Sequence, residues 1–177
     1  MKFLVIGLGS MGKRRVRNLI ALGNNDIAGF DLRKDRCLEA SEKYGIASFP
    51  DIESALKSFC PDALVISTSP AHHMQYAWRG FELGLPCFIE ASVVDADRIL
   101  ELHEISEDSP VLIAPSCTMR HYQGPKKVKE LIEQCVIGKP LNVNYQTGQY
   151  LPDWHPWEKI EDFYVSERET GAGREIV

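Results

Sequence analysis

The chain has 177 residues, of which 44% are hydrophobic and 25% charged, and its formal net charge is -5. This composition is typical of a globular protein with one full core and part of a second, and the negative balance gives no support to a nucleic-acid-binding surface. No apolar run approaches the length of a membrane span. Five cysteines, none spaced as C-x-x-C, predict reduced thiols in a cytoplasmic protein.

The first predicted element is a buried strand that runs into a glycine-rich turn. The apolar run 3–6 is followed by Gly7, Gly9 and Gly12, which form the pattern G-x-G-x-x-G before a predicted helix over 13–22. The first glycine permits a sharp turn, the second lets a pyrophosphate approach the backbone, and the third lets helix and strand pack closely. Taken alone, the pattern is as consistent with a plain turn as with a dinucleotide site.

A second predicted strand, over 26–30, ends in an acidic residue. Asp31 lies about 20 residues after the last glycine, where a carboxylate binds the ribose hydroxyls of NAD. Arg33 and Arg36 follow, and either could bind the 2′-phosphate of NADP instead. We expect NAD because the Asp31 carboxylate would repel that phosphate, but NADP stays open. The basic residues over 13–17 are interpreted as the solvated face of a helix near an anionic cofactor.

Helices and strands continue to alternate as far as residue 116. Helices are predicted over 33–44, 52–59, 71–83 and 95–107, and strands over 46–49, 63–67, 86–90 and 111–114. This alternation predicts an α/β fold, a Rossmann-type doubly wound parallel sheet with right-handed crossovers. Residues 68–70 and Glu90 then come to the carboxyl edge of the sheet, where such folds bind ligands.

Local signals also predict caps and inward-facing side chains. Asp51 is a predicted N-cap for the helix over 52–59. Apolar spacing predicts the inward faces of three helices, which comprise Cys37, Leu38, Ala40 and Tyr44; Ile99, Leu100, Leu102 and Ile105; and Val128, Leu131, Ile132 and Cys135.

The pattern changes after residue 116. A helix is predicted over 126–136 and a strand over 141–150, followed by a stretch rich in Trp, Pro and His. We therefore expect residues 1–116 to form a dinucleotide-binding Rossmann domain and residues 117–177 to be the incomplete start of an α+β substrate or oligomerisation domain. Apolar surface left exposed there would favour a homo-oligomer.

Four ordered segments resemble the Gfo/Idh/MocA family of NAD(P)-dependent oxidoreductases, named for glucose-fructose oxidoreductase and inositol dehydrogenase. The segments are GLGSMGKRRVRNL, STSPAHHMQYAWRGFELGLPCFIEAS, TMRHYQGPKKVKELIEQCVIGKP and ETGAGREIV, and they span the whole chain. The resemblance implies hydride transfer between a nicotinamide cofactor and a hydroxyl-bearing carbon of a sugar, cyclitol or nucleotide sugar.

The resemblance also assigns roles to matching positions. It implies that residues 9–11 contact the pyrophosphate, Asp31 the adenosine ribose and Glu90 the nicotinamide ribose. Together with the residue patterns, it gives the cofactor-binding candidates Gly7, Gly9, Ser10, Met11, Gly12, Asp31, Arg33, Thr68, Ser69, Pro70, His73 and Glu90. Arg120 and Trp154 are the substrate-side candidates. No metal site is expected, because His121 and His155 are isolated from carboxylates and cysteines at ligand spacing.

Two departures from the family pattern bear on catalysis. Where the family has Glu-Lys-Pro, this chain has Glu90-Ala91-Ser92, and Ala91 lacks the charge and the donor of that lysine. Losing such a group costs a factor of about 10² to 10⁴ in rate. The family's catalytic histidine follows the glycine-rich loop, whereas this sequence stops at Val177, as a fragment or a shortened form would. We therefore assign no catalytic residue and keep a catalytically silent dinucleotide-binding or partner-binding module as the alternative.

Overall fold

The computed structural model describes residues 1–91, 94–146, 148, 150, 153, 156 and 159–162. Within them, a six-stranded sheet has the order β3-β2-β1-β4-β5-β6, and every pairing is parallel. The strands are β1 (Phe3–Ile6), β2 (Ile27–Phe30), β3 (Ala47–Phe49), β4 (Ala63–Ile66), β5 (Cys87–Ile89) and β6 (Ile113–Pro115). The chain reverses its direction across the sheet between β1 and β4, the point where doubly wound sheets bind ligands. The predicted fold class is confirmed.

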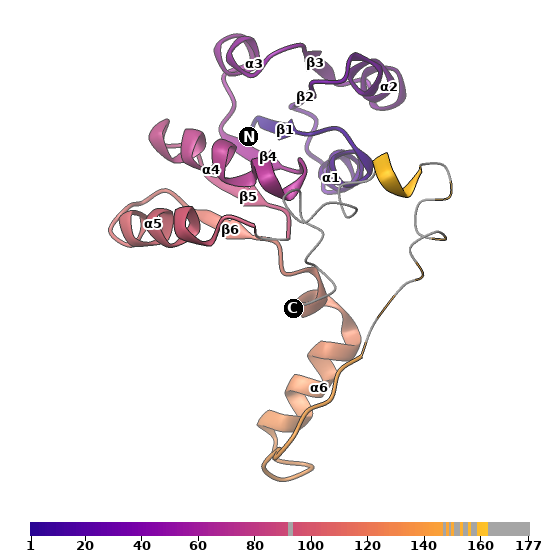
Figure 1. The fold of residues 1–177 in the computed structure, drawn as a ribbon, viewed down its shortest axis with the longest axis vertical. Helices are drawn as coiled ribbons and strands as arrows, with labels where there is room; N and C mark the ends of the chain where they lie inside the picture. Colours follow the sequence, from indigo (N-terminus) through magenta and orange to yellow (C-terminus); the bar gives the residue numbers. More distant parts are fainter. Residues whose placement is uncertain are drawn as a thin grey trace.

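Helices cover both faces of this sheet (Figure 1). The α-helices are α1 (Ser10–Ala21), α2 (Lys34–Tyr44), α3 (Ile52–Phe59), α4 (His73–Glu82), α5 (Ala96–Ser106) and α6 (Gln123–Glu133). Short 3-10 turns are η1 (Pro70–His72), η2 (Thr118–His121) and η3 (Ile160–Asp162). Among the described residues, no helix has both the length and the apolar character needed to cross a bilayer.

The core is divided by the sheet into two clusters. One cluster joins α3, α4 and α5 to strand residues that include Leu4 and Ile6. The other joins α1 and α2 to strand residues that include Val5. Because successive strand residues point to opposite faces, the continuous apolar run of β1 fills both clusters at once. The strand that carries the glycine-rich turn therefore lies inside the sheet, between β2 and β4, with Leu4, Val5 and Ile6 buried.

Helix boundaries follow local signals with small shifts. The N-cap prediction for Asp51 is confirmed, since its Oδ1 accepts a hydrogen bond from the Ser54 N–H at 2.8 Å. Helix α1 begins at Ser10, inside the glycine pattern, rather than at residue 13. This earlier start brings its free N–H groups to the turn itself.

Some predicted inward faces are wrong. Leu38, Leu100 and Ile105 are exposed, whereas Cys37 and Leu102 are buried. A helix rotates by about 100° per residue, so the neighbour of an inward residue points to the side of the helix, and apolar character alone did not identify the inward position.

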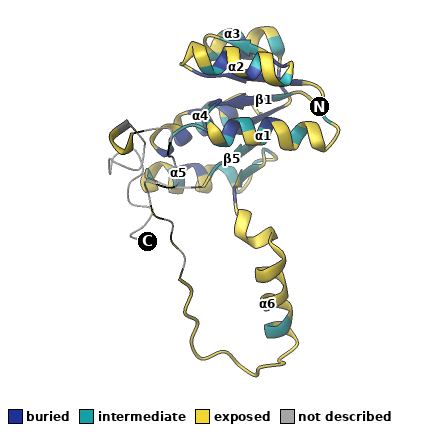
Figure 2. Ribbon diagram, turned by 90° about the vertical axis from the view of Figure 1, so that its right-hand side faces the viewer, coloured by how far each residue is buried: buried dark blue, intermediate teal, exposed yellow. Residues whose placement is uncertain are grey.

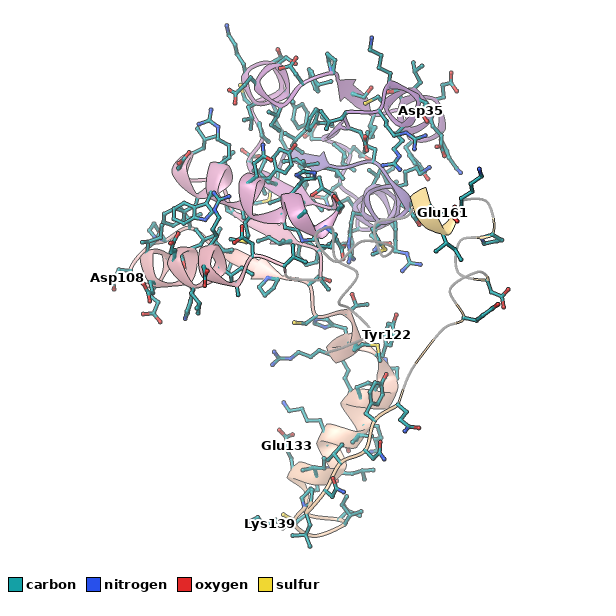
Figure 3. The ribbon with its side chains drawn as sticks, in the orientation of Figure 1. Asp35, Asp108, Tyr122, Glu133, Lys139 and Glu161 are labelled. Carbon is teal, nitrogen blue, oxygen red and sulfur yellow. The ribbon has the colours of Figure 1, made fainter. Side chains whose placement is uncertain are left out.

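Beyond β6 the chain leaves the sheet as an arm that carries α6 (Figures 1 and 3, with Tyr122, Glu133 and Lys139 labelled along it). Val128 and Cys135 are exposed, against prediction, and α6 is exposed over most of its length (Figure 2). Residues 141–146 form no strand, which corrects the strand predicted over 141–150. A strand needs a partner for its backbone groups, and no described strand lies beside this segment.

Candidate functional site

The glycine-rich turn is shaped by two steric requirements. Gly7 has φ +88°, and a Cβ there would lie 2.7 Å from the Ser67 carbonyl oxygen. A Cβ on Gly12 would lie 1.8 Å from the Gly7 carbonyl oxygen. Gly7 therefore needs to be glycine for its positive φ and its close approach to the backbone after β4. Gly12 needs to be glycine so that the start of α1 can pack against the end of β1. The first and third glycines of the pattern serve the fold.

Gly9 is different, because its surroundings are open. Leaving out its chain neighbours, the part of the chain that the structure describes places only the Arg36 guanidinium within 4 Å of a Cβ built there, with Nη1 at 3.5 Å. Gly9 is the N-cap of α1, and its carbonyl accepts the first helical hydrogen bond, from Lys13 N–H at 3.0 Å. Ser10 is exposed and Met11 half-buried in that first turn. The N–H groups of residues 10–12 thus precede the helical ladder beside bare main chain, an arrangement suited to an anion.

Asp31, at the end of β2, is tied to the same turn. Its side chain is 8% exposed, and its Oδ2 accepts a hydrogen bond from the Leu8 N–H at 2.7 Å. Its Oδ1 accepts another from the Arg33 N–H at 2.9 Å, and Arg36 Nη1 lies 3.6 Å from Oδ2. A carboxylate has about four acceptor positions, so Asp31 retains capacity for a ligand hydroxyl. The buried charge is stabilised by two main-chain donors and one cation.

The two arginines near Asp31 occupy different places. The Arg33 side chain is exposed and makes a bidentate contact with Asp35, at 3.1 and 2.6 Å. This hydrogen-bonded contact lowers the pKa of Asp35, which Figure 3 labels on α2. Arg36, in contrast, reaches back over the turn between Gly9 and Asp31. Arg33 contributes its main-chain N–H to the site, and Arg36 contributes its guanidinium.

The end of β4 supplies hydroxyl groups and a buried histidine. Ser67 is buried, and within the described residues its Oγ has no hydrogen-bond partner. His73 is also buried, and its Nε2 lies 2.9 Å from the Thr68 carbonyl oxygen. Thr68 and Ser69 are half-buried, and Pro70 begins η1. His73 therefore packs beneath the loop over 68–70 and holds its backbone.

Glu90, directly after β5, is held by a residue that the sequence analysis did not single out. The Arg15 Nε donates to Glu90 Oε1, and both side chains are largely buried. The same guanidinium lies 5.0 Å from the centre of the Phe88 ring and 3.4 Å from Ser116 Oγ. The position of Arg15 in the sequence could have identified it. Arg15 follows Gly12 by about one helical turn and so lies on the face of α1 turned toward the sheet.

Other predicted residues lie away from this cluster or outside the described residues. Ala91 is exposed beside Glu90, and Ser92 is outside the described residues. Arg120 is exposed in η2 at the start of the arm, and Trp154 is also outside the described residues. Across the described ranges, no group of three or more His, Cys, Asp or Glu could hold a metal ion.

Taken together, the edge fits a dinucleotide. Gly9 leaves the main chain bare where a Cβ would otherwise stand, and the N–H groups at the start of α1 adjoin it. The buried Asp31 carboxylate stands beside this turn at the β1–β2 end of the edge, and Glu90 stands at the β5 end. The main-chain N–H groups are donors suited to a phosphate, and the two carboxylates are acceptors suited to ribose hydroxyls.

Comparison with known proteins gives related sequences. The chain matches the model of the Gfo/Idh/MocA oxidoreductase family, described as having an NAD-binding Rossmann fold, over residues 1–108. It is 27% identical over 146 residues to myo-inositol 2-dehydrogenase of Thermotoga maritima, covering 79% of this chain and 43% of that protein. It is 27% identical over 174 residues to inositol 2-dehydrogenase 3 of Saccharopolyspora erythraea, covering 94% of this chain and 51% of that protein.

A solved structure confirms the fold. The myo-inositol dehydrogenase of Lactobacillus casei, in complex with NAD(H) and myo-inositol, superposes with a TM-score of 0.71 at 22% identity. The match covers 80% of this chain and 43% of that chain, so this chain spans about half the length of the relatives it matches. The chain belongs to the Gfo/Idh/MocA family of oxidoreductases, whose dinucleotide-binding domain has the Rossmann fold.

Proposed function

We propose that NAD(H) binds along the carboxyl edge of the sheet, with its pyrophosphate on the glycine-rich turn. The observation that carries this proposal is the contact of Asp31 with the Leu8 N–H, which fixes a buried carboxylate beside the bare backbone of Gly9. Family membership supports it, because the family is NAD-binding.

Each part of the edge has a distinct task in this proposal. The N–H groups of residues 10–12 and the positive end of α1 bind the pyrophosphate. Asp31 accepts hydrogen bonds from the adenosine ribose with the lone pairs left over from Leu8 and Arg33. Glu90 does the same at the nicotinamide ribose, and Arg15 holds its carboxylate in place. When bound, the nicotinamide supplies the hydride acceptor or donor.

The proposed substrate is a small polyhydroxylated molecule, a cyclitol or a sugar, oxidised at one hydroxyl-bearing carbon. Its support is that two relatives are named as inositol 2-dehydrogenases. Because the chain spans about half of those proteins, this activity is proposed for the protein as a whole and not for the edge alone.

A second candidate is a module that binds the dinucleotide without turning over a substrate. Ala91 favours it, because a methyl group stands where the family resemblance implies a lysine. Alanine cannot donate a proton or a hydrogen bond, and within the described residues the neighbouring carboxylate of Glu90 is already paired with Arg15. Cofactor binding and catalysis are therefore separable in this chain.

The test combines a binding and a turnover measurement. NADH is titrated into the chain while its fluorescence is followed, and reduction of NAD is then monitored with myo-inositol. Because the activity is proposed for the whole protein, turnover is measured in a chain extended to the length of its relatives. Turnover there supports the oxidoreductase, and binding without turnover there supports the silent module. Ala91→Lys is the informative variant, with Ala96→Lys, at another exposed alanine, as its control. For an oxidoreductase we expect Ala91→Lys alone to raise the rate by about 10² to 10⁴. Absence of NADH binding at millimolar concentration contradicts both candidates.

A further inference from the structure

We propose that Arg36 binds the 2′-phosphate of NADP(H), so that this site accepts both NADP(H) and NAD(H). The inference rests on the proposed function, since it concerns the adenosine end of the same edge. The sequence alone left Arg33 and Arg36 as equal candidates and favoured NAD on account of Asp31. The structure separates the two arginines and changes the electrostatics around Asp31.

The first step is the position of the Arg36 guanidinium. Arg36 lies in the first turn of α2, and its side chain is 33% exposed. Its Nη1 is 3.6 Å from Asp31 Oδ2 and 3.5 Å from the place of a Cβ on Gly9. The guanidinium therefore lies between the predicted ribose acceptor and the predicted pyrophosphate turn, at the end where a 2′-phosphate would be.

The second step is the donor capacity of this group. At 3.6 Å the contact with Asp31 is ionic and longer than a hydrogen bond, so it leaves the N–H donors of Arg36 available. Asp31 is the only ionic partner of Arg36 among the residues that the structure describes. A planar guanidinium with free donors beside open space is well suited to bind a phosphate group in a bidentate way.

The third step is the charge of Asp31. Two main-chain N–H groups and the Arg36 cation surround this buried carboxylate. Its negative charge is therefore largely compensated, and the repulsion expected between Asp31 and a 2′-phosphate is weakened. With NAD, Arg36 remains beside Asp31, and with NADP it shifts toward the added phosphate.

Arg33 provides the contrast within the same loop. Its guanidinium is exposed and held in a bidentate contact with Asp35. Only its main-chain N–H belongs to the site. Substituting the Arg33 side chain therefore removes an equal charge at nearly the same place in the sequence without removing the proposed ligand.

The experiment titrates NADH and NADPH separately into the unmodified chain, Arg36→Gln and Arg33→Gln, following nicotinamide fluorescence. Competition by 2′,5′-ADP and by 5′-AMP repeats the comparison without the nicotinamide. We expect the unmodified chain to bind NADPH within about tenfold of NADH. Arg36→Gln should weaken NADPH about 10- to 100-fold and NADH by less than about threefold, whereas Arg33→Gln should not weaken NADPH selectively. Melting temperatures verify that the variants are folded.

Several results would overturn the inference. NADPH binding more than tenfold weaker than NADH in the unmodified chain would show that Asp31 still excludes the phosphate. An equal loss of affinity for both cofactors in Arg36→Gln would make Arg36 a pyrophosphate contact. A selective loss of NADPH affinity in Arg33→Gln would show that Arg33, and not Arg36, binds the 2′-phosphate. Failure of both cofactors to bind the unmodified chain instead contradicts the proposed function itself.

Discussion

The two halves of the sheet's carboxyl edge are built differently. On the β1–β2 half, the buried Asp31 carboxylate is held by main-chain N–H groups of Leu8 and Arg33. On the β4–β5 half, the Glu90 carboxylate is held by a side chain, Arg15, and the next residue is Ala91, which offers no polar group.

This difference shows how binding and chemistry can diverge within one fold. Main-chain contacts persist as long as the turn keeps its shape, so the half that would bind adenosine and pyrophosphate is preserved by the fold itself. Side-chain contacts change with single substitutions, so the half that would hold the nicotinamide can lose a group and still fold. The first two predictions below alter one half each, and the others compare the halves or provide a reference.

The largest effect is expected at Gly12, on the first half. In Gly12→Ala the new Cβ would meet the Gly7 carbonyl at 1.8 Å, and backbone on both sides prevents relief. We expect a loss of at least about 4 kcal/mol in the free energy of unfolding, or failure to fold. Urea denaturation measures it, and Gly124→Ala, at a helical glycine with open space around it, is the matched control. A Gly12→Ala protein as stable as that control would disprove the packing described here.

The second half should respond to Arg15→Ala. Removing the guanidinium leaves the largely buried Glu90 without its cation, and we expect a loss of about 2–3 kcal/mol in the free energy of unfolding. Glu90→Ala should cost a similar amount, and the double variant should cost less than the sum, because the two residues form one unit. Chemical denaturation of the four proteins completes the cycle, and strict additivity would mean that the pair is not coupled.

Asp51 lies outside both halves and gives a smaller reference effect. Asp51→Ala removes the N-cap of α3, and we expect the melting temperature to fall by about a few degrees. Hydrogen bonds from Ser54 lower the pKa of Asp51, so its stabilising contribution is present above the unfolded-state pKa and is lost as the pH falls through the lowered value. The melting difference between Asp51→Ala and the unmodified chain should therefore shrink in acid, and a constant difference would argue against the cap.

Thiol labelling reports on each half without altering its stability. The Cys37 thiol contacts the Asp31 carbonyl on the first half, and Cys87 begins β5, the strand that leads to Glu90 on the second. Burial raises the pKa of both thiols, that of Cys87 to about 12, so neither is a thiolate at pH 8. Ellman's reagent should label Cys60, Cys117 and Cys135 first. Arg15→Ala should speed labelling of Cys87 and leave Cys37 unchanged, and equal acceleration of both would show that the halves open together.

Local patterns predicted the parts of the fold that depend on neighbours in sequence. The glycine pattern, Asp31 at the end of β2 and the cap at Asp51 each follow from short spacings. The pair of Arg15 with Glu90 joins residues 75 positions apart, and the contact of Arg15 with Ser116 spans 101 positions. No short-range pattern records such a contact, so Arg15 was interpreted as one of several solvated basic residues.

The distinction between Arg33 and Arg36 was inaccessible for a similar reason. Both arginines follow shortly after Asp31 in the chain. The sequence does not show where either side chain points. The start of α2 at Lys34 places Arg36 inside the helix, from where it reaches back over the turn, and leaves Arg33 outside as the N-cap. The prediction of a strand over 141–150 is wrong for another reason. An alternating residue pattern is suited to a strand but cannot supply the neighbouring strand that pairing requires.

The most direct test of the central claim is an NADH titration of Gly9→Ala against the unmodified chain. Gly9 has φ -68°, and among the described residues an added Cβ would meet the flexible Arg36 side chain alone, so the fold should tolerate the change. The same methyl group would stand where the pyrophosphate approaches the main chain. We predict a melting temperature within about 2 °C of the unmodified chain and NADH binding weakened at least about tenfold. Unchanged NADH affinity in a folded Gly9→Ala protein would contradict the placement of the cofactor on this turn.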